Sequence, residues 1–200
     1  ATFVGNASAN IIDARASGTN NLSGLAGNDT LIVDASRIGT VDGGADNDTL
    51  RFVSATGITL FDSQFGGFTS IESYDFSGVA GDINVAIGSA AQGLGIATLS
   101  GGTANSTLTA ESSYGANAVY FTAGNGNDSL TGAAGNDKLV AGGGAARLTG
   151  NDGNDSFLFA SGTQIANNTV VGGAGTDTLV LTATSTITDA QLVNVSGVEA

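Results

Sequence analysis

Large apolar residues recur at intervals of nine positions, each flanked by β-favouring residues and separated by segments rich in Gly and Asn. Four consecutive nonapeptides fill residues 123–158 and place a large apolar residue at position eight: Leu130, Leu139, Leu148 and Phe157. One inward side chain with such neighbours predicts a very short strand in each nonapeptide. Two nonapeptides are expected to close one coil, so that strands 18 residues apart, such as those of Leu130 and Leu148, stack in parallel.

Three further nonapeptides lie outside this tandem block, at 24–32, 43–51 and 172–180. Between the blocks, residues 81–122 lack the repeat but keep β character, because Ile83, Val85 and Ile87 alternate with Asn and Ala. The absence of Pro favours a ladder of paired strands. The pattern predicts an all-β chain, a right-handed parallel β-solenoid that runs through residues 1–200 as a single continuous segment.

A longer repeat overlies the nonapeptides, in residues 41–78 and 170–200. Both cassettes run from a Gly-Gly…Asp-Thr-Leu strand through a Thr-rich loop to an apolar residue followed by Glu, which is Glu72 or Glu199. This internal repetition indicates a segment of a longer repetitive protein. Evidence for helices is thin: only Thr188–Gln191 fits a capping box that could begin one or two helical turns.

The composition excludes several classes of chemistry. The chain contains no Cys and no His, so it has no disulfides, no zinc or haem site of the usual kind and no Ser-His or Cys-His nucleophile pair. Its net charge of −13 would repel nucleic acid and anionic membrane surfaces and would attract hard cations. No apolar run approaches the length of a membrane span.

The candidate ligands lie in the turns between the short strands. Asp occupies position six of most nonapeptides, and Gly occupies positions one, two and four, where it permits tight turns and a close approach of the backbone to a ligand. Nonapeptides of this form are typical of calcium-binding parallel β-helices. The candidate metal-binding residues are Asp137, Asp155, Asp128, Asp29, Asp48, Asp177, Asp46, Gly132, Gly135, Gly150 and Gly153.

Three other interpretations of these turns fit the sequence less well. Asp is common in solvated Gly-rich turns, but a random turn does not repeat Gly two residues before the Asp and Leu or Phe two residues after it. A phosphate-binding loop would need a Gly-Lys-Ser/Thr triplet, and the only Lys, Lys138, does not lie in one. An EF-hand fails because neither Asp46–Asp48 nor Asp152–Asn154 continues with the required Gly and Glu.

On these nonapeptides the chain resembles the repeats-in-toxin (RTX) family of calcium-binding proteins, which are exported by type I secretion. The cassette that ends in Ser-Gly-Val-Glu-Ala, with the Ala- and Thr-rich composition, is further similar to RTX-type bacterial surface-layer proteins. The resemblance implies a parallel β-roll in which calcium lies between adjacent coils, held by position-six Asp side chains and loop carbonyls.

Carried onto this chain, the resemblance implies that Asp137 and Asp155, which are 18 residues apart, share one calcium site. Asp128 would face Ala146, which leaves a half-site. Asp29 and Asp48 are 19 residues apart, and Asp46 replaces the Gly of position four.

The resemblance implies a non-enzymatic function: a structural calcium-binding segment of a secreted or cell-surface bacterial protein that folds on extracellular calcium. Its expected partners are calcium and neighbouring copies in a surface lattice or filament, without nucleic acid or a membrane span. Two alternatives stay open, an ancillary calcium-binding module of a type I-secreted enzyme and the stalk of an RTX adhesin.

Overall fold

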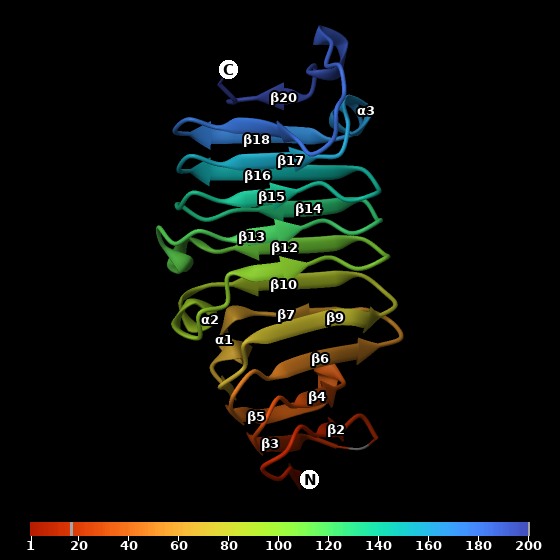
Figure 1. Ribbon diagram of the computed structural model, residues 1–200, viewed down its shortest axis with the longest axis vertical. Coiled ribbons are helices and arrows are strands. Elements are labelled where there is room, and N and C mark those ends of the chain that lie inside the picture. Colours follow the sequence, from red (N-terminus) through yellow and green to blue (C-terminus); the bar gives the residue numbers. More distant parts are fainter. Residues whose placement is uncertain (17, 200) are drawn as a thin grey trace.

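The computed structural model describes residues 1–16 and 18–199, so that Ala200, the last residue of the second cassette, lies outside the described part. The described chain forms short strands that run back and forth and stack in sequence order from one end to the other (Figure 1). Each described strand pairs in parallel with a strand two or three positions away in the chain order, not with its immediate neighbour. We call the chain between a strand and its next partner one layer.

The strands belong to four parallel sheets. The first two sheets contain the N-terminal strands β1 (Thr2–Val4), β3 (Asn20–Ala26), β5 (Ile38–Ala45) and β8 (Phe68–Thr69), and β2 (Ile11–Asp13), β4 (Thr30–Val33), β6 (Thr49–Ser54) and β9 (Ser73–Val79). The third sheet contains β7 (Ile58–Leu60), β10 (Ile83–Ile87), β12 (Ser106–Ala110), β14 (Asp128–Thr131), β16 (Ala146–Asp152), β18 (Thr169–Ala174) and β20 (Val195–Ser196). The fourth sheet contains β11 (Thr98–Ser100), β13 (Tyr120–Thr122), β15 (Lys138–Val140), β17 (Ser156–Phe159) and β19 (Thr178–Leu181). The all-β expectation is confirmed, because the described helices are few and short.

The register follows the nonapeptide period inside the tandem block. Leu130 pairs with Leu148 and Leu139 with Phe157, and the hydrogen bond between Asp137 and Asp155 spans the same 18 residues. Layers outside the block are longer because they carry insertions. The bond that links Asp48 to Glu72, for example, spans 24 residues.

The core is a narrow row of side chains between the sheets. The position-eight residues fill it, and six of them are 0% exposed: Leu31, Leu50, Leu130, Leu139, Leu148 and Phe157. Full burial of one such side chain contributes about 1.5–3 kcal/mol. Larger aromatic residues enter where the layers lengthen, as in the stacked rings of Phe52 and Phe76, whose centroids lie 4.9 Å apart.

Single-turn helices occupy the inserted segments. They are η1 (Ala35–Arg37), α1 (Asp62–Phe65), α2 (Ser89–Gly93), η2 (Ser112–Tyr114), α3 (Gly162–Ala166) and η3 (Asp189–Gln191). Only η3 corresponds to the helix start expected at Thr188, whose capping box with Gln191 is present. Among the described residues, no helix is long and apolar enough to cross a membrane.

Candidate metal centre

The parallel register places position-six residues of successive layers directly above one another. Thr30 pairs with Thr49, which stacks Asp29 on Asp48, and Lys138 pairs with Ser156, which stacks Asp137 on Asp155. Asp29 and Asp48 are 19 residues apart, whereas Asp137 and Asp155 are 18 residues apart. This difference does not prevent the stacking, because a register shift between β3 and β5 accommodates the extra residue.

Hydrogen bonds join the stacked residues into what we call an aspartate ladder: the backbone N–H of one position-six residue donates to the carboxylate of the next layer. In the first ladder, Asn10 donates to Asp29 and Asp29 to Asp48, each at 2.7 Å, and Asp48 donates to Glu72 at 2.8 Å. Hydrogen bonds to a charged acceptor stabilise by about 1.5–3 kcal/mol each. The ladder therefore holds the turns in register.

The second ladder passes through the tandem block. Val119 donates to Asp137 at 2.8 Å, Asp137 to Asp155 at 2.7 Å, and Asp155 to Asp177 at 2.8 Å. Asp177 then donates to Glu199 at 2.7 Å. Three of the predicted aspartates thus lie in one uninterrupted series.

Asp128 lies on the opposite edge of the tandem block, in a less regular series. Its carboxylate accepts the N–H of Ser106 at 2.7 Å, and it pairs with Ala146 in the next layer, as its spacing predicts. Ala146 supplies no carboxylate, but its own N–H donates to the side-chain oxygen of Asn168 at 2.5 Å. Asn10, Ser106 and Asn168 are ladder residues that sequence analysis missed, because none of them is Asp.

The second carboxylate oxygen of most ladder aspartates is buried without a hydrogen-bond partner. This holds for Oδ2 of Asp29, Asp48, Asp128, Asp155 and Asp177, whose residues are between 0% and 5% exposed. Oδ2 of Asp137 differs, because it accepts the N–H of Ala133 at 2.6 Å. A buried anionic oxygen without a partner is costly, which indicates that a cation completes its environment.

The position-one glycines form a space for these oxygens. A Cβ atom on Gly132 would collide with Oδ2 of Asp137 and approach the carbonyl of Gly150 in the next layer. A Cβ atom on Gly150 would likewise meet Oδ2 of Asp155 and the carbonyl of Gly172. Neither glycine has a positive φ. At these two positions Gly is therefore needed for space rather than for conformational freedom, whereas the nonapeptide of Asp128 has Ala123 at position one.

A Cβ atom on a position-four glycine would meet the backbone of the preceding layer rather than a ladder carboxylate. Gly135 and Gly153 pack against the backbone of the preceding layer, and Gly153 has a φ of 113°. Asp46 takes the same left-handed conformation, with a φ of 82°, and its exposed carboxylate accepts the N–H of Gly27 at 3.1 Å. The Asp46 carboxylate thus hydrogen-bonds to the position-four residue of the preceding layer rather than to a residue of the aspartate ladder.

Asparagines at position five form a second series on the outer side of the turns. Asn154 donates its N–H to the side-chain oxygen of Asn136, and Thr176 donates to that of Asn154, both at 2.8 Å. The Asn47 N–H donates to Asn28 in the same way at 3.1 Å. The recurrent Asn-Asp pair in the sequence is the signal for both series: the Asn marks the outer series and the Asp marks the ladder.

Burial shifts the acid–base equilibria of the ladder. It raises the pKa of Asp137 and of Asp155 to about 6, because the charged form loses hydration and the N–H donors compensate only in part. Burial also raises the pKa of Asp48 and of Asp128. These carboxylates resist ionisation without a cation beside them.

The calcium-free protein is therefore expected to lose stability as the pH rises from about 4 to about 6. The pKa of Asp137 and Asp155 lies near 6 in the fold, against about 3.9 in an unfolded chain. The folded state thus binds more protons in this window, and its stability falls as those protons leave. Thermal unfolding in chelator across this range measures the effect. The Asp137→Asn/Asp155→Asn double variant should give a flatter profile, and a wild-type stability that rises with pH would contradict the assignment.

The atoms of these turns that can coordinate a metal ion are carboxylate and carbonyl oxygens, which suit a hard cation such as calcium. Among the described residues, no three acidic side chains converge closely enough to hold a metal ion by themselves. A site between two layers would combine the Oδ2 atoms of ladder aspartates with turn carbonyls such as those of Gly150 and Gly172. Calcium accepts six to eight oxygen ligands, so such a mixed set fits it.

Comparison with known proteins agrees with this chemistry. The family model of the RTX calcium-binding nonapeptide repeat, in four copies, matches residues 2–31, 16–36, 40–51, 120–148 and 165–182. No curated protein matches the chain at a significant level. The matched segments include the N-terminal layer of Asn10, which sequence analysis did not recognise as a repeat. The chain thus carries RTX calcium-binding nonapeptide repeats, and calcium is the ion that these repeats bind.

Proposed function

We propose that the chain is a structural, calcium-binding segment of a secreted bacterial surface protein, which folds and assembles on meeting extracellular calcium. The observation that carries this proposal is the series of buried Oδ2 atoms without partners along the turns. A row of anionic oxygens in a chain of net charge −13 opposes its own folding until cations bind.

The architecture that we propose is a right-handed, closed β-solenoid of the β-roll type, continuous over residues 1–200. The parallel pairing in sequence order and the 18-residue step of the tandem block support it. Calcium would lie between the layers. Asp137 with Asp155 and Asp29 with Asp48 would form sites together with the position-one carbonyls, while Asp128, facing Ala146, would form a weaker half-site.

The proposed location follows from calcium affinity. Extracellular calcium modules have dissociation constants of about 10⁻⁴–10⁻³ M, far above the calcium concentration of the cytosol. Such a chain would stay unfolded inside the cell, in a state suitable for export, and would fold on release because binding free energy becomes folding free energy. RTX repeats are typical of secreted bacterial proteins, and the matched segments lie in both halves of this chain.

A surface-assembly function is tested by imaging the full-length protein in millimolar calcium and after chelation. We expect ordered sheets or filaments in calcium that dissolve in chelator and re-form when calcium returns. Monodisperse particles with an enzymatic activity would favour the ancillary module of a secreted enzyme. Isolated extended stalks that bind a surface ligand would favour an adhesin. Either outcome would contradict the proposed assembly.

A further inference from the structure

Two segments outside the nonapeptides, 61–72 and 188–199, share one order of residues. Each has Asp in its second position, Gln in its fourth and Glu in its twelfth, which is Glu72 in the first segment and Glu199 in the second. We call each segment a glutamate module. The cassettes noted in the sequence contain these modules, but the family model matches neither module.

The two modules also share one conformation. Each begins with a single helical turn, α1 or η3, whose Gln side chain accepts the N–H of the residue before the helix. Gln64 does so at 2.9 Å and Gln191 at 2.8 Å. A two-residue strand follows, β8 or β20, and then a residue in the left-handed conformation, Ser70 with a φ of 51° or Gly197 with a φ of 61°.

Each module ends an aspartate ladder. The carboxylate of Glu72 accepts the N–H of Asp48 at 2.8 Å, and that of Glu199 accepts the N–H of Asp177 at 2.7 Å. These are the bonds that a position-six aspartate of the next layer makes elsewhere in the ladders. The glutamates therefore take the place of that aspartate in the layer where the nonapeptide is missing.

The carbonyls of the left-handed residues replace those of the position-one glycines. A Cβ atom on Gly43 would meet the carbonyl oxygen of Ser70 together with Oδ2 of Asp48. A Cβ atom on Gly172 would meet the carbonyl oxygen of Gly197 together with Oδ2 of Asp177. Asp48 and Asp177 are 1% and 0% exposed, and their Oδ2 atoms have no hydrogen-bond partner. Each module thus faces a buried anionic oxygen that lacks a counter-charge.

The longer side chain of Glu fits the shorter turn. In a nonapeptide, position six follows position one by five residues, as Asp48 follows Gly43. In the modules, Glu72 and Glu199 follow the equivalent residues, Ser70 and Gly197, by only two. The extra methylene of Glu lets its carboxylate accept the ladder hydrogen bond from this shortened turn.

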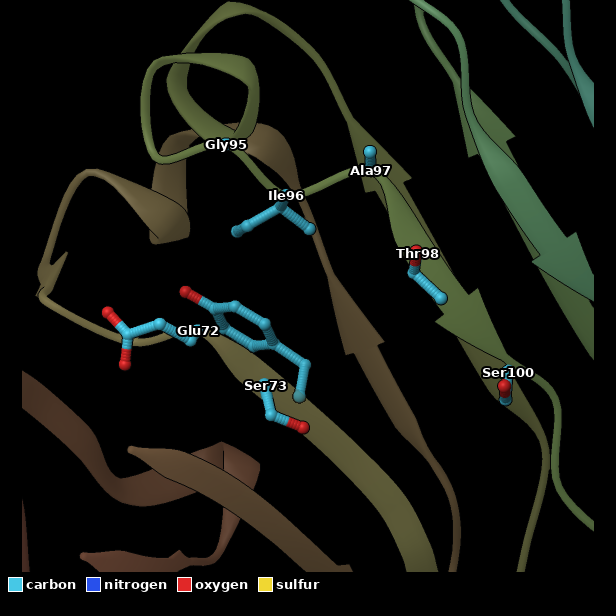
Figure 2. A pocket seen from close by; sticks show the side chains of 8 residues that line it. Glu72, Ser73, Gly95, Ile96, Ala97, Thr98 and Ser100 are labelled. Atoms are coloured by element: carbon cyan, nitrogen blue, oxygen red, sulfur yellow. The ribbon is translucent and has the colours of Figure 1, made fainter. Parts of the chain in front are cut away.

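The glutamate in the first module is accessible from a neighbouring cavity. Figure 2 shows Glu72 and Ser73 on one side of this cavity and Ile96, Ala97 and Thr98 on the other. The cavity has a volume of about 390 Å³ and lies between β9 and β11, which belong to different sheets. The Glu72 end of the first ladder therefore borders a cavity, whereas Asp48 in the layer before it is buried.

We infer that Glu72 and Glu199 are additional calcium ligands, each completing a site that the last nonapeptide of its ladder leaves open. The first site would combine Glu72, Oδ2 of Asp48 and the carbonyl of Ser70. The second would combine Glu199, Oδ2 of Asp177 and the carbonyl of Gly197. This inference rests on the proposed calcium-dependent function and adds a second type of calcium-binding segment to the nonapeptide.

The test compares calcium binding by the 200-residue chain with Glu72→Gln, Glu199→Gln and Glu111→Gln variants. Glu111 is the only other glutamate, and its side chain accepts a hydrogen bond from the hydroxyl of Ser113 at 3.4 Å, outside both ladders. Isothermal titration with calcium chloride should show the loss of one ion, or at least tenfold weaker binding at one site, in each module variant. The Glu111 variant should bind like the wild type. Gln preserves length and an acceptor oxygen, so the ladder hydrogen bond survives and the lost charge is measured.

Non-additivity separates a shared site from general destabilisation. The Asp48→Asn/Glu72→Gln double variant should bind as many calcium ions as Asp48→Asn alone. The Asp155→Asn/Glu72→Gln double variant should bind fewer calcium ions than either single variant.

If Glu72→Gln does not recover the wild-type circular dichroism at saturating calcium, the test rests on Glu72→Asp and Glu199→Gln. Glu72→Asp keeps the charge, but its shorter side chain does not reach the site, so this variant should also lose the ion. Wild-type binding in both module variants would overturn this inference alone. A wild-type chain that binds no calcium would overturn the proposed function instead.

Discussion

Removing calcium at neutral pH is expected to convert the chain from a β-rich fold to a largely unfolded state. Ionised carboxylates of the ladders would then lie stacked and buried without counter-ions, five of them with an oxygen that no donor satisfies. An ion at ten times its dissociation constant, which is what millimolar calcium supplies to a site of about 10⁻⁴ M, stabilises the folded state by about 1.4 kcal/mol per site. About four such sites reach the lower end of the roughly 5–15 kcal/mol by which a domain is usually stable. Far-ultraviolet circular dichroism in millimolar calcium, then in chelator, measures the change.

Magnesium provides the matched control for this prediction. It is smaller than calcium, demands octahedral geometry and keeps several waters, so a set of carbonyls and carboxylates between two layers should hold it poorly. Calcium added after chelation should restore the β signal, while equimolar magnesium should not. A chain that keeps its full β structure in chelator would show that its hydrophobic rows and ladder hydrogen bonds suffice, and calcium-coupled folding would then be wrong.

The repeating part of the fold could be predicted because its signal is local and periodic. Leu130, Leu139 and Phe157 mark the nine-residue period, and the period alone gives the 18-residue register that stacks Asp137 on Asp155. The three α-helices of the described residues could not be predicted in this way. They contain four or five residues each, too few for a helical hydrophobic pattern, and tertiary contacts with neighbouring layers hold them in place.

Only some of the residues that form the ladders could be predicted from the sequence. Asp29, Asp48 and Asp177 are marked by their nonapeptides, whereas Asn10 and Asn168 occupy equivalent places without the Asp that the motif requires. The glutamates of the cassettes could be paired by position, but their hydrogen bonds depend on the shortened turns. The space beside each position-one glycine is a property of two adjacent layers, so it requires the three-dimensional register.

Replacement of Asp155 by Ala is expected to abolish the calcium site that it shares with Asp137. Asp155 lies in the middle of the second ladder, accepts the N–H of Asp137 at 2.7 Å and presents its unpartnered Oδ2 toward the carbonyl of Gly172. The variant should bind at least one calcium ion fewer and gain less thermal stability from calcium. Asp155→Asn retains an acceptor for the N–H of Asp137, so a similar calcium loss there would assign the effect to the charge.

Asp75→Ala is the control, because it removes the same charge from a partly buried aspartate outside the nonapeptides. Asp75 pairs with Arg51 at 2.6 Å and accepts the N–H of Ser77, so its loss should cost the roughly 0–1 kcal/mol of a partly exposed ion pair. Its calcium stoichiometry should equal that of the wild type. Titration calorimetry and thermal unfolding with and without calcium measure both variants. Equal calcium loss in the two would mean that net charge, rather than the stacked position-six carboxylates, governs binding.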